Sequence, residues 1–397
     1  MSKPFKKKVK VSELISLIPN HLYVFLADVY QSNKWVKKLR SEVLFKLIIY
    51  TLLSTERLSL RVLQAQASSS MFAVLARLSI DELAHTTIRA RLLEIDSGYF
   101  RDLHAHVYEQ LSTHYSQRQL AKYHLKRYDS TLVATFAHLI DGMRVGPHKN
   151  SKRQVKYSTE LTDDCLIRVA YLSDQVYLSE ETALSQLIED QTHRENEIVV
   201  FDRGLKNRKT LQRFDQNQLG FVTRLKAKVR YQKHSEAEKL PQNTATLEFV
   251  QDAKVYLYQS GDQSFKHLFR LIEVKVKGAE EPLIFLTNLF DLEADKIAHI
   301  YKMRWDIEVL FKFLKQEMNL KHLISSDPNA IQSMLYCTLI AAMLVLIYKA
   351  KNNIRAYKDA KIRFFNELQA TILLDILNTK GGDEWLKERV QHHVDYG

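Results

Sequence analysis

The order of segments between residues 124 and 202 constrains the fold of this chain more than any other feature of its sequence. Three segments rich in Val, Thr, Tyr and Phe predict β-strands: HLKRYDSTLVATFAHLI, RQVKYSTEL and CLIRVAYLS. SEETALSQLIED then predicts a helix with acids in its first turn, and NEIVVFDRG predicts a short strand that is apolar throughout. Such a strand is typical of the middle of a sheet, where both faces are buried. The segment therefore predicts a mixed sheet with at least one helix packed on it.

The flanking segments predict helices before this sheet and more strands after it. Residues 1–120 show apolar spacings of three and four, and Ser79–Glu82 fits a capping box. After a predicted helix at 205–219 and the strand GFVTRLK come four further predicted strands: TLEFV, AKVYLYQ, HLFRLIEVKVK and PLIFLTNLF. One long helix is predicted from Leu292 to Gln316, and then helices to the end, interrupted at KGGDEW. The expected fold class is α+β or α/β, with helical N-terminal and C-terminal regions.

The charge balance points to a polyanionic partner. Lys and Arg number 58 against 46 Asp and Glu, which gives a formal net charge of +12 and a pI near 9.3. Such a balance is typical of nucleic-acid-binding proteins, although a merely basic protein would also show it. The helical residues 1–120 allow two interpretations, a solvated bundle or a DNA-binding domain with Arg89 and Arg91 as groove or phosphate contacts.

Several classes of protein are excluded. The chain has 2 cysteines, too few for a disulfide scaffold or a cysteine-based zinc site. No G-x-x-x-x-G-K-[ST] motif occurs, so we expect no use of ATP. The longest apolar run, Leu335–Tyr348, is shorter than the roughly 20 residues of a spanning helix, so we expect a buried helix and no membrane. The N-terminus lacks a secretory signal, and the expected location is the cytoplasm.

Three carboxylates stand out by their positions. Asp129 lies inside a predicted strand, where aspartate is disfavoured, and Asp202 ends the apolar strand. The ends of central strands are where α/β sheets place their sites, but either aspartate alone is also compatible with a local turn. The third, Glu308, lies on the helix YKMRWDIEVLFKFLK.

This predicted helix carries an unusual polar stripe. At about 100° per residue, Glu308 shares an arc of about 80° with a phenol and three cations, namely Tyr301, Arg304, Lys312 and Lys315. A salt-bridged surface helix would explain the charges. A site in which Glu308 binds a metal and the other side chains bind phosphates would explain both the charges and the tyrosine.

The spacing of Tyr301, Arg304, Glu308 and Lys315 resembles the Y-R-E-K signature of the insertion-sequence-four family of bacterial DDE transposases. FDRG with Asp202 and RYDST with Asp129 look like the other two acidic motifs of that family. The resemblance covers roughly residues 124–320. It implies an RNase H-like core interrupted by a β-strand insertion, and a catalytic, metal-binding triad of Asp129, Asp202 and Glu308.

The resemblance also implies the activity. Two Mg²⁺ (or Mn²⁺) ions would support cutting at terminal inverted repeats and joining of the 3′-hydroxyl ends to target DNA. The expected DNA-binding residues are Tyr301, Arg304, Trp305, Lys312, Lys315 and Arg203. The family holds a flipped base with a Trp of the insertion, which has none here, so Trp305, Tyr231 or Tyr256 would take that role. The expected partners are double-stranded DNA and a second copy of the chain, as a homodimer on DNA.

The chain accordingly divides into five expected parts. They are a helical DNA-binding domain at 1–120, the first part of the catalytic core at 121–228, the β-strand insertion at 229–291, the signature helix at 292–325 and a helical C-terminal region at 326–397. Basic stretches at 203–233 and 145–156 would form a phosphate track or an ordinary solvated face. Two other functions fit the same residues: an RNase H-like nuclease that cuts without joining, and a non-catalytic basic DNA-binding protein.

Overall fold

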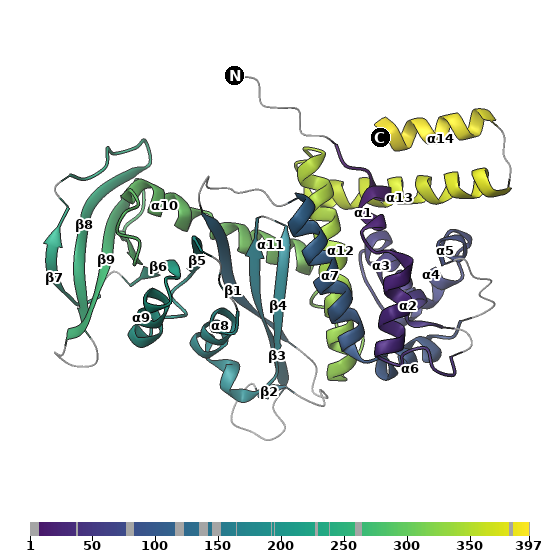
Figure 1. The fold of residues 1–397 in the computed structure, drawn as a ribbon, viewed down its shortest axis with the longest axis horizontal. Helices are drawn as coiled ribbons and strands as arrows, with labels where there is room; N and C mark the ends of the chain where they lie inside the picture. Colours follow the sequence, from purple (N-terminus) through teal and green to yellow (C-terminus); the bar gives the residue numbers. More distant parts are fainter. Residues whose placement is uncertain are drawn as a thin grey trace.

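A long mixed sheet, flanked by helices on both faces, forms the centre of the computed structural model of the chain, and a helical body lies at one end (Figure 1). The structure describes residues 8–36, 39–76, 83–115, 123–134, 142–144, 152–163, 165–191, 193, 195–226, 229–237, 239–258, 264–380 and 384–396. Within these residues the sheet has ten strands in the order β2-β3-β1-β5-β6-β10-β9-β8-β7, with β4 paired to β3.

The strands confirm the predicted order in the first half of the sheet. β1 pairs antiparallel with β3 and parallel with β5, and β5 pairs parallel with β6. The strands are β1 (His124–Ala134), β2 (Met143–Arg144), β3 (Arg153–Thr162), β4 (Leu166–Leu172), β5 (Glu197–Phe201), β6 (Gly220–Leu225), β7 (Tyr231–Glu236), β8 (Leu247–Tyr258), β9 (Ser264–Val276) and β10 (Leu283–Thr287). The mixed α/β class expected from the sequence is therefore confirmed.

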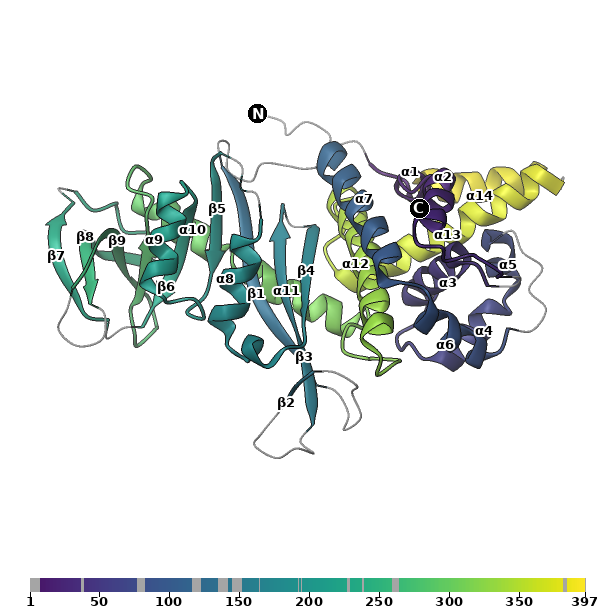
Figure 2. The same ribbon diagram turned by 60° about the horizontal axis from the view of Figure 1, so that its bottom comes forward.

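Helices cover the sheet on both faces. α8 (Glu180–Glu189) follows the 3₁₀ turn η1 (Gln175–Leu178), and with α9 (Arg208–Gln216) it packs on one face. α10 (Ala294–Lys302) and α11 (Trp305–Gln316) pack on the other face (Figure 2). The helical body contains α1 (Val11–Ser16), α2 (Asn20–Val29), α3 (Ser41–Ser54), α4 (Leu60–Ala67), α5 (Ser70–Ala76), α6 (His85–Glu94), α7 (Ser97–Tyr115), α12 (Pro328–Lys351), α13 (Tyr357–Lys380) and α14 (Glu384–Tyr396).

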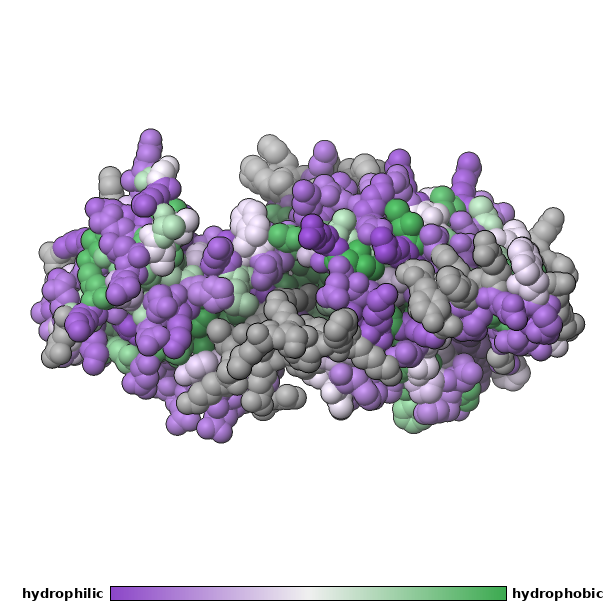
Figure 3. Space-filling model, turned by 90° about the horizontal axis from the view of Figure 1, so that it is seen from above, coloured by the Kyte–Doolittle hydropathy of each residue, from purple (hydrophilic) through white to green (hydrophobic). Residues whose placement is uncertain are grey.

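Helices from the two ends of the chain share one hydrophobic core. This core also includes residues of β3, β4 and α11, so it joins the helical body to the sheet. α12 is long and apolar enough to cross a membrane by composition, but 89% of its most apolar window is buried inside the protein. The prediction of a buried helix at Leu335–Tyr348 is confirmed. On the face in Figure 3, hydrophobic areas are small and separated by hydrophilic residues.

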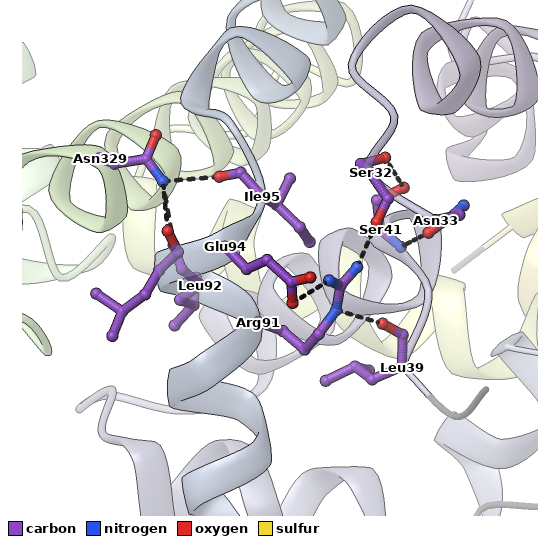
Figure 4. A network of polar contacts seen from close by, with 10 residues as sticks. Ser32, Asn33, Leu39, Ser41, Arg91, Leu92, Glu94, Ile95 and Asn329 are labelled. Atoms are coloured by element: carbon purple, nitrogen blue, oxygen red, sulfur yellow. Dashed lines mark hydrogen bonds and ion pairs between the residues drawn. The ribbon is translucent and has the colours of Figure 1, made fainter. Parts of the chain in front are cut away.

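One predicted DNA contact is instead part of this helical body (Figure 4). The Arg91 side chain is buried; its Nε donates to the carbonyl oxygen of Leu39 (2.9 Å), and its Nη2 donates to that of Ser32 (2.7 Å). Its Nη1 donates to Glu94 at 2.6 Å. A guanidinium bound in this way cannot reach a phosphate, so Arg91 is not the contact that the DNA-binding interpretation of residues 1–120 allowed, whereas Arg89 is exposed.

Other predictions are corrected by local geometry. The expected helix Leu292–Gln316 is two helices. The backbone N–H groups of Arg304 and Asp306 donate to carbonyl groups three residues earlier instead of four, which interrupts the α-helical pattern. TLEFV and AKVYLYQ form one strand, β8, whose register shifts twice against β9. β7 was not predicted, because its sequence is polar and exposed. The capping box at 79–82 lies outside the described residues.

Buried His104 on α7 links the helical body to β4. Its Nε2 donates to the carbonyl oxygen of Ile167 at 2.8 Å, which fixes the neutral tautomer. Burial lowers the pKa of His104 to about 4, since the charged form is poorly solvated there. As the pH falls, His104 therefore takes up a proton in the unfolded chain before it does so in the folded chain. We expect protonation of His104 to lower the free energy of unfolding by about 2 kcal/mol between pH 7 and 4.5.

Urea unfolding at the two pH values tests this expectation. His104→Gln should lose that part of the pH dependence, whereas His114→Gln, which changes an exposed histidine of the same helix, should keep it. Equal pH dependence in His104→Gln and the unchanged chain would contradict the assignment.

Candidate active site

The strand register brings two predicted carboxylates side by side. Parallel strands β1 and β5 pair Arg127 with Val200; two residues further along the chain are Asp129, on β1, and Asp202, the first residue after β5. Residues in register on parallel strands point to the same face. That face is the one covered by α10 and α11, because Leu125, Ile198 and Val200 belong to the core beneath α10.

The third carboxylate reaches this position from the break between the two covering helices. Glu308 lies in the first turn of α11, and Arg304 lies at the junction between α10 and α11. The Arg304 Nη2 donates to Glu308 Oε1 at 2.6 Å, and the two side chains are 12% and 35% exposed. This pair is the salt bridge expected of an ordinary helix, but here it is held against the sheet.

The other two members of the signature also contact this region. The Tyr301 hydroxyl donates to Asp202 Oδ1 at 2.9 Å, and the Lys315 ammonium donates to the Thr131 hydroxyl. Thr131 follows Asp129 by two residues on β1, so it points to the same face. Tyr301, Arg304, Glu308 and Lys315 therefore all lie around the pair of aspartates, as the sequence predicted for one site.

The electrostatics of the site centre on Asp129 and Arg304. Burial raises the pKa of Asp129 to about 6, against the opposing effects of the Ser130 N–H bond and of the Arg304 charge. Arg304 also interacts electrostatically with Asp202 and Glu308. A single cation therefore interacts with all three acids and stabilises their charged forms.

Three predicted DNA contacts lie at the rim of the site. Lys312 and Arg203 are exposed. Trp305 is 59% exposed and borders a pocket of about 910 Å³ that lies between α10 and strands of the sheet. Tyr231 and Tyr256 are partly buried on β7 and β8 and do not line this pocket, so among the three predicted aromatics only Trp305 borders it, together with Tyr301 and Arg304.

The donor set fits a divalent cation in its chemistry. Hard carboxylate oxygens are the ligands that Mg²⁺ prefers. Two buried polar groups near these carboxylates, the Thr159 hydroxyl and Nε of Arg304, have no hydrogen-bond partner among the described residues. In the described part of the chain no three His, Cys, Asp or Glu side chains lie close enough together to share one ion. Glu308 is bonded to Arg304, and Asp202 is bonded to Tyr301.

Sequence reasoning missed two neighbours of the site. Thr159 pairs directly with Asp129 across β1 and β3, and a buried threonine in a strand carries no functional signal of its own. Glu180 begins α8, and its charge raises the pKa of Asp129 further, although burial is the main cause. An acid in the first turn of a helix is expected for helix stability alone, so the sequence did not indicate that Glu180 also interacts with Asp129.

Comparison with known proteins identifies the family of the chain. The family model described as "Transposase DDE domain" matches residues 129–344, a range that begins at Asp129 and contains Asp202 and Glu308. The "Putative transposase for insertion sequence element IS4SA" of Synechocystis sp. is 25% identical over 70% of this chain and 77% of its own length. The "Probable transposase for insertion sequence element IS5377" of Geobacillus stearothermophilus is 28% identical over 39% of this chain and 40% of its own length.

A solved structure shares the fold. The piggyBac transposase in a synaptic complex with hairpin DNA aligns with a TM-score of 0.53 at 10% identity, over 99% of this chain and 87% of that one. At this identity the likeness shows the fold alone, and it confirms the expected RNase H-like class. Because the family model matches more than half of the chain, the protein belongs to the DDE transposases, enzymes that cleave DNA and transfer its strands.

Proposed function

We propose that this transposase cuts at the terminal inverted repeats of its own insertion sequence and joins the freed 3′-hydroxyl ends to target DNA. Asp129, Asp202 and Glu308 are the residues that would hold two Mg²⁺ (or Mn²⁺) ions. When bound, such ions activate the attacking oxygen and stabilise the leaving one. The observation that carries the proposal is the register of β1 and β5, which supports Asp129 and Asp202 at the same end and face of the sheet. Arg304, which is bonded to Glu308, interacts electrostatically with both aspartates.

The side chains around the three acids are suited to binding phosphate and to orienting the carboxylates. The planar Arg304 guanidinium presents N–H donors that suit a phosphate in the same way as they suit the Glu308 carboxylate. It would therefore exchange its carboxylate partner for a DNA phosphate. Tyr301 orients Asp202 through its hydroxyl. Lys315 places a positive charge next to Asp129. These contacts also support placing the chain in the insertion-sequence-four family, whose signature has these four residues.

The exposed residues of the site's rim would bind DNA. Arg203 and Lys312 are exposed cations, and Trp305 offers an indole ring for stacking with a base. Two ends must be cut and joined together, so the active assembly would be a homodimer on DNA. Its place of action would be the bacterial cytoplasm, where its DNA lies.

A strand-transfer assay tests the proposal. Duplexes that carry the element ends, already cut to expose 3′-hydroxyl groups, are incubated with supercoiled target DNA and Mg²⁺. We expect joined products, and none with Asp202→Asn. Cutting of uncut ends without any joining of pre-cut ends would instead identify a nuclease. Binding of the ends with neither reaction, in Mg²⁺ as in EDTA, would identify a non-catalytic DNA-binding protein.

A further inference from the structure

α2 has an apolar outer face that the helical body does not cover. Its inner face packs on the body, where the ring of buried Tyr23 lies 5.8 Å from that of Phe45 on α3. On the outer face the side chains of Val24, Phe25 and Val29 are 63%, 60% and 55% exposed. Adjacent apolar side chains that remain exposed on one helix are typical of an interaction surface.

The exposed residues of α2 form one continuous stripe. At about 100° per residue they lie within an arc of about 140°, on the side of the helix opposite Tyr23. The residues of this α2 stripe are His21, Val24, Phe25, Asp28 and Val29. The stripe therefore has an apolar centre with one polar residue on each side of it along the helix.

The charge of the α2 stripe favours a protein over DNA as its partner. The ten residues of α2 contain no Lys or Arg, although the chain has 58 such residues in 397. A surface that binds DNA carries cations that neutralise phosphates. The stripe instead carries a carboxylate, on Asp28, which would repel the DNA backbone.

The α2 stripe is complementary to a second copy of itself. A two-fold axis beside Val24 and Phe25 places two α2 helices antiparallel, with the apolar centres of both stripes in contact. His21 and Asp28 lie equally far from that axis on opposite sides, so His21 of each copy faces Asp28 of the other. An isologous contact of this kind requires such self-complementarity, and the imidazole can donate to the carboxylate.

We propose that α2 is a contact between two copies of this chain, packed antiparallel about a two-fold axis at Val24 and Phe25. The contact would serve the homodimer of the proposed function and rests on it for its role in joining, although not for its geometry. One pair of short helices is expected to bury less than the roughly 1,200–2,000 Å² of a standard interface. The dimer would therefore be weak until bound DNA ends bring two copies together.

Disulfide formation in the full chain tests the position of the axis. The native cysteines, Cys165 and Cys337, are both buried, so an introduced surface cysteine can be oxidised selectively. Under mild oxidation, Val24→Cys is expected to give at least about tenfold more crosslinked dimer than Ala65→Cys, because position 24 lies beside its own copy. Ala65 is an exposed residue of α4 and measures random collision. Equal yields would overturn the proposed contact.

Two further cysteine variants test the antiparallel orientation. His21→Cys and Asp28→Cys each place a thiol about 10.5 Å along the helix axis from the same position in the second copy, too far for a disulfide. The two positions face each other, so a mixture of the two variants should crosslink and neither variant alone should. Crosslinking within each variant alone would indicate a parallel pair and overturn the proposal.

Charge exchange tests the same contact without cysteines. Phe25→Asp and His21→Asp should each lower the dimer fraction at least about fivefold in light scattering of the chain with pre-cut end duplexes. Adding Asp28→His to His21→Asp should restore the dimer, because the facing pair is then present with its members exchanged. Binding of a single end duplex should stay within about twofold, and thermal unfolding checks that each variant folds.

The outcomes separate this contact from the function that it serves. If the unchanged chain joins pre-cut ends and Phe25→Asp joins them equally well as a dimer, the copies meet through another surface and the inference is wrong. If crosslinking follows the expected pattern and no ends are joined, the contact stands and the proposed function is wrong. A monomer with both ends bound would overturn the inference directly.

Discussion

Asp129→Asn is expected to reduce DNA cleavage at least about 10³-fold, because the proposed metal site loses one of its three carboxylates. Asn has nearly the same shape as Asp, so the strand pairing of β1 and the contact with the Ser130 N–H remain available. DNA binding should change little, since the exposed cations at the rim are untouched. The measurement is single-turnover cleavage of a labelled end duplex in Mg²⁺.

Stability provides the control for this variant. Burial raises the pKa of Asp129 from 3.8 to about 6, so ionisation of this group costs stability as the pH increases between these two values, and the cost is complete above pH 6. At pH 8 in EDTA, Asp129→Asn should be at least as stable as the unchanged chain. Asp375→Asn on α13, an exposed position, should affect neither activity nor stability. Retained cleavage in Asp129→Asn would exclude Asp129 from the chemistry.

Arg304→Ala is expected to change two quantities in opposite directions. Cleavage should fall about 10²-fold, because a guanidinium that stabilises phosphate charge is lost. Mn²⁺ binding without DNA should become several-fold tighter, because Arg304 no longer competes for Glu308, to which it donates at 2.6 Å. Arg304→Lys should keep the charge but not the forked geometry. Its cleavage rate should lie between those of the unchanged chain and of Arg304→Ala.

Lys302→Ala is the matched control for Arg304. Lys302 is exposed on α10, two residues before Arg304, so its removal subtracts the same charge without touching Glu308. Both quantities should stay within about twofold of those of the unchanged chain. Weaker Mn²⁺ binding in Arg304→Ala would contradict the competition, since it would mean that Arg304 supports the site in the absence of DNA.

The sequence predicted the parts of the site that depend on local pattern. The apolar strand before Asp202 and the strand around Asp129 follow from residue type alone, and their parallel pairing makes the two acids neighbours. The Y-R-E-K spacing predicts Glu308 and the cations around it as one group. That prediction assumes one continuous helix, whereas the residues lie on α10, on α11 and at the junction between them. The break at Arg304 depends on how α10 and α11 pack on the sheet, which periodicity does not encode.

The parts that escaped prediction depend on tertiary contacts. Arg91 resembles a DNA contact in a basic sequence, and only the fold shows it bound to Ser32 and Leu39. Glu180 resembles an ordinary first-turn acid until the loop after Asp202 passes it at Gly204. The long sheet is also a tertiary result, because β10 pairs with β6 and so extends the same sheet through the strands between residues 231 and 276.

The central claim is that Asp129, Asp202 and Glu308 converge on divalent ions when DNA is bound. Anomalous diffraction from Mn²⁺ in crystals of the chain with a cut end duplex tests it most directly. We expect two peaks about 3.5–4 Å apart that contact these carboxylates, with Arg304 turned from Glu308 to a phosphate. Manganese bound elsewhere, with Glu308 still paired to Arg304 and Asp202 to Tyr301, would contradict it.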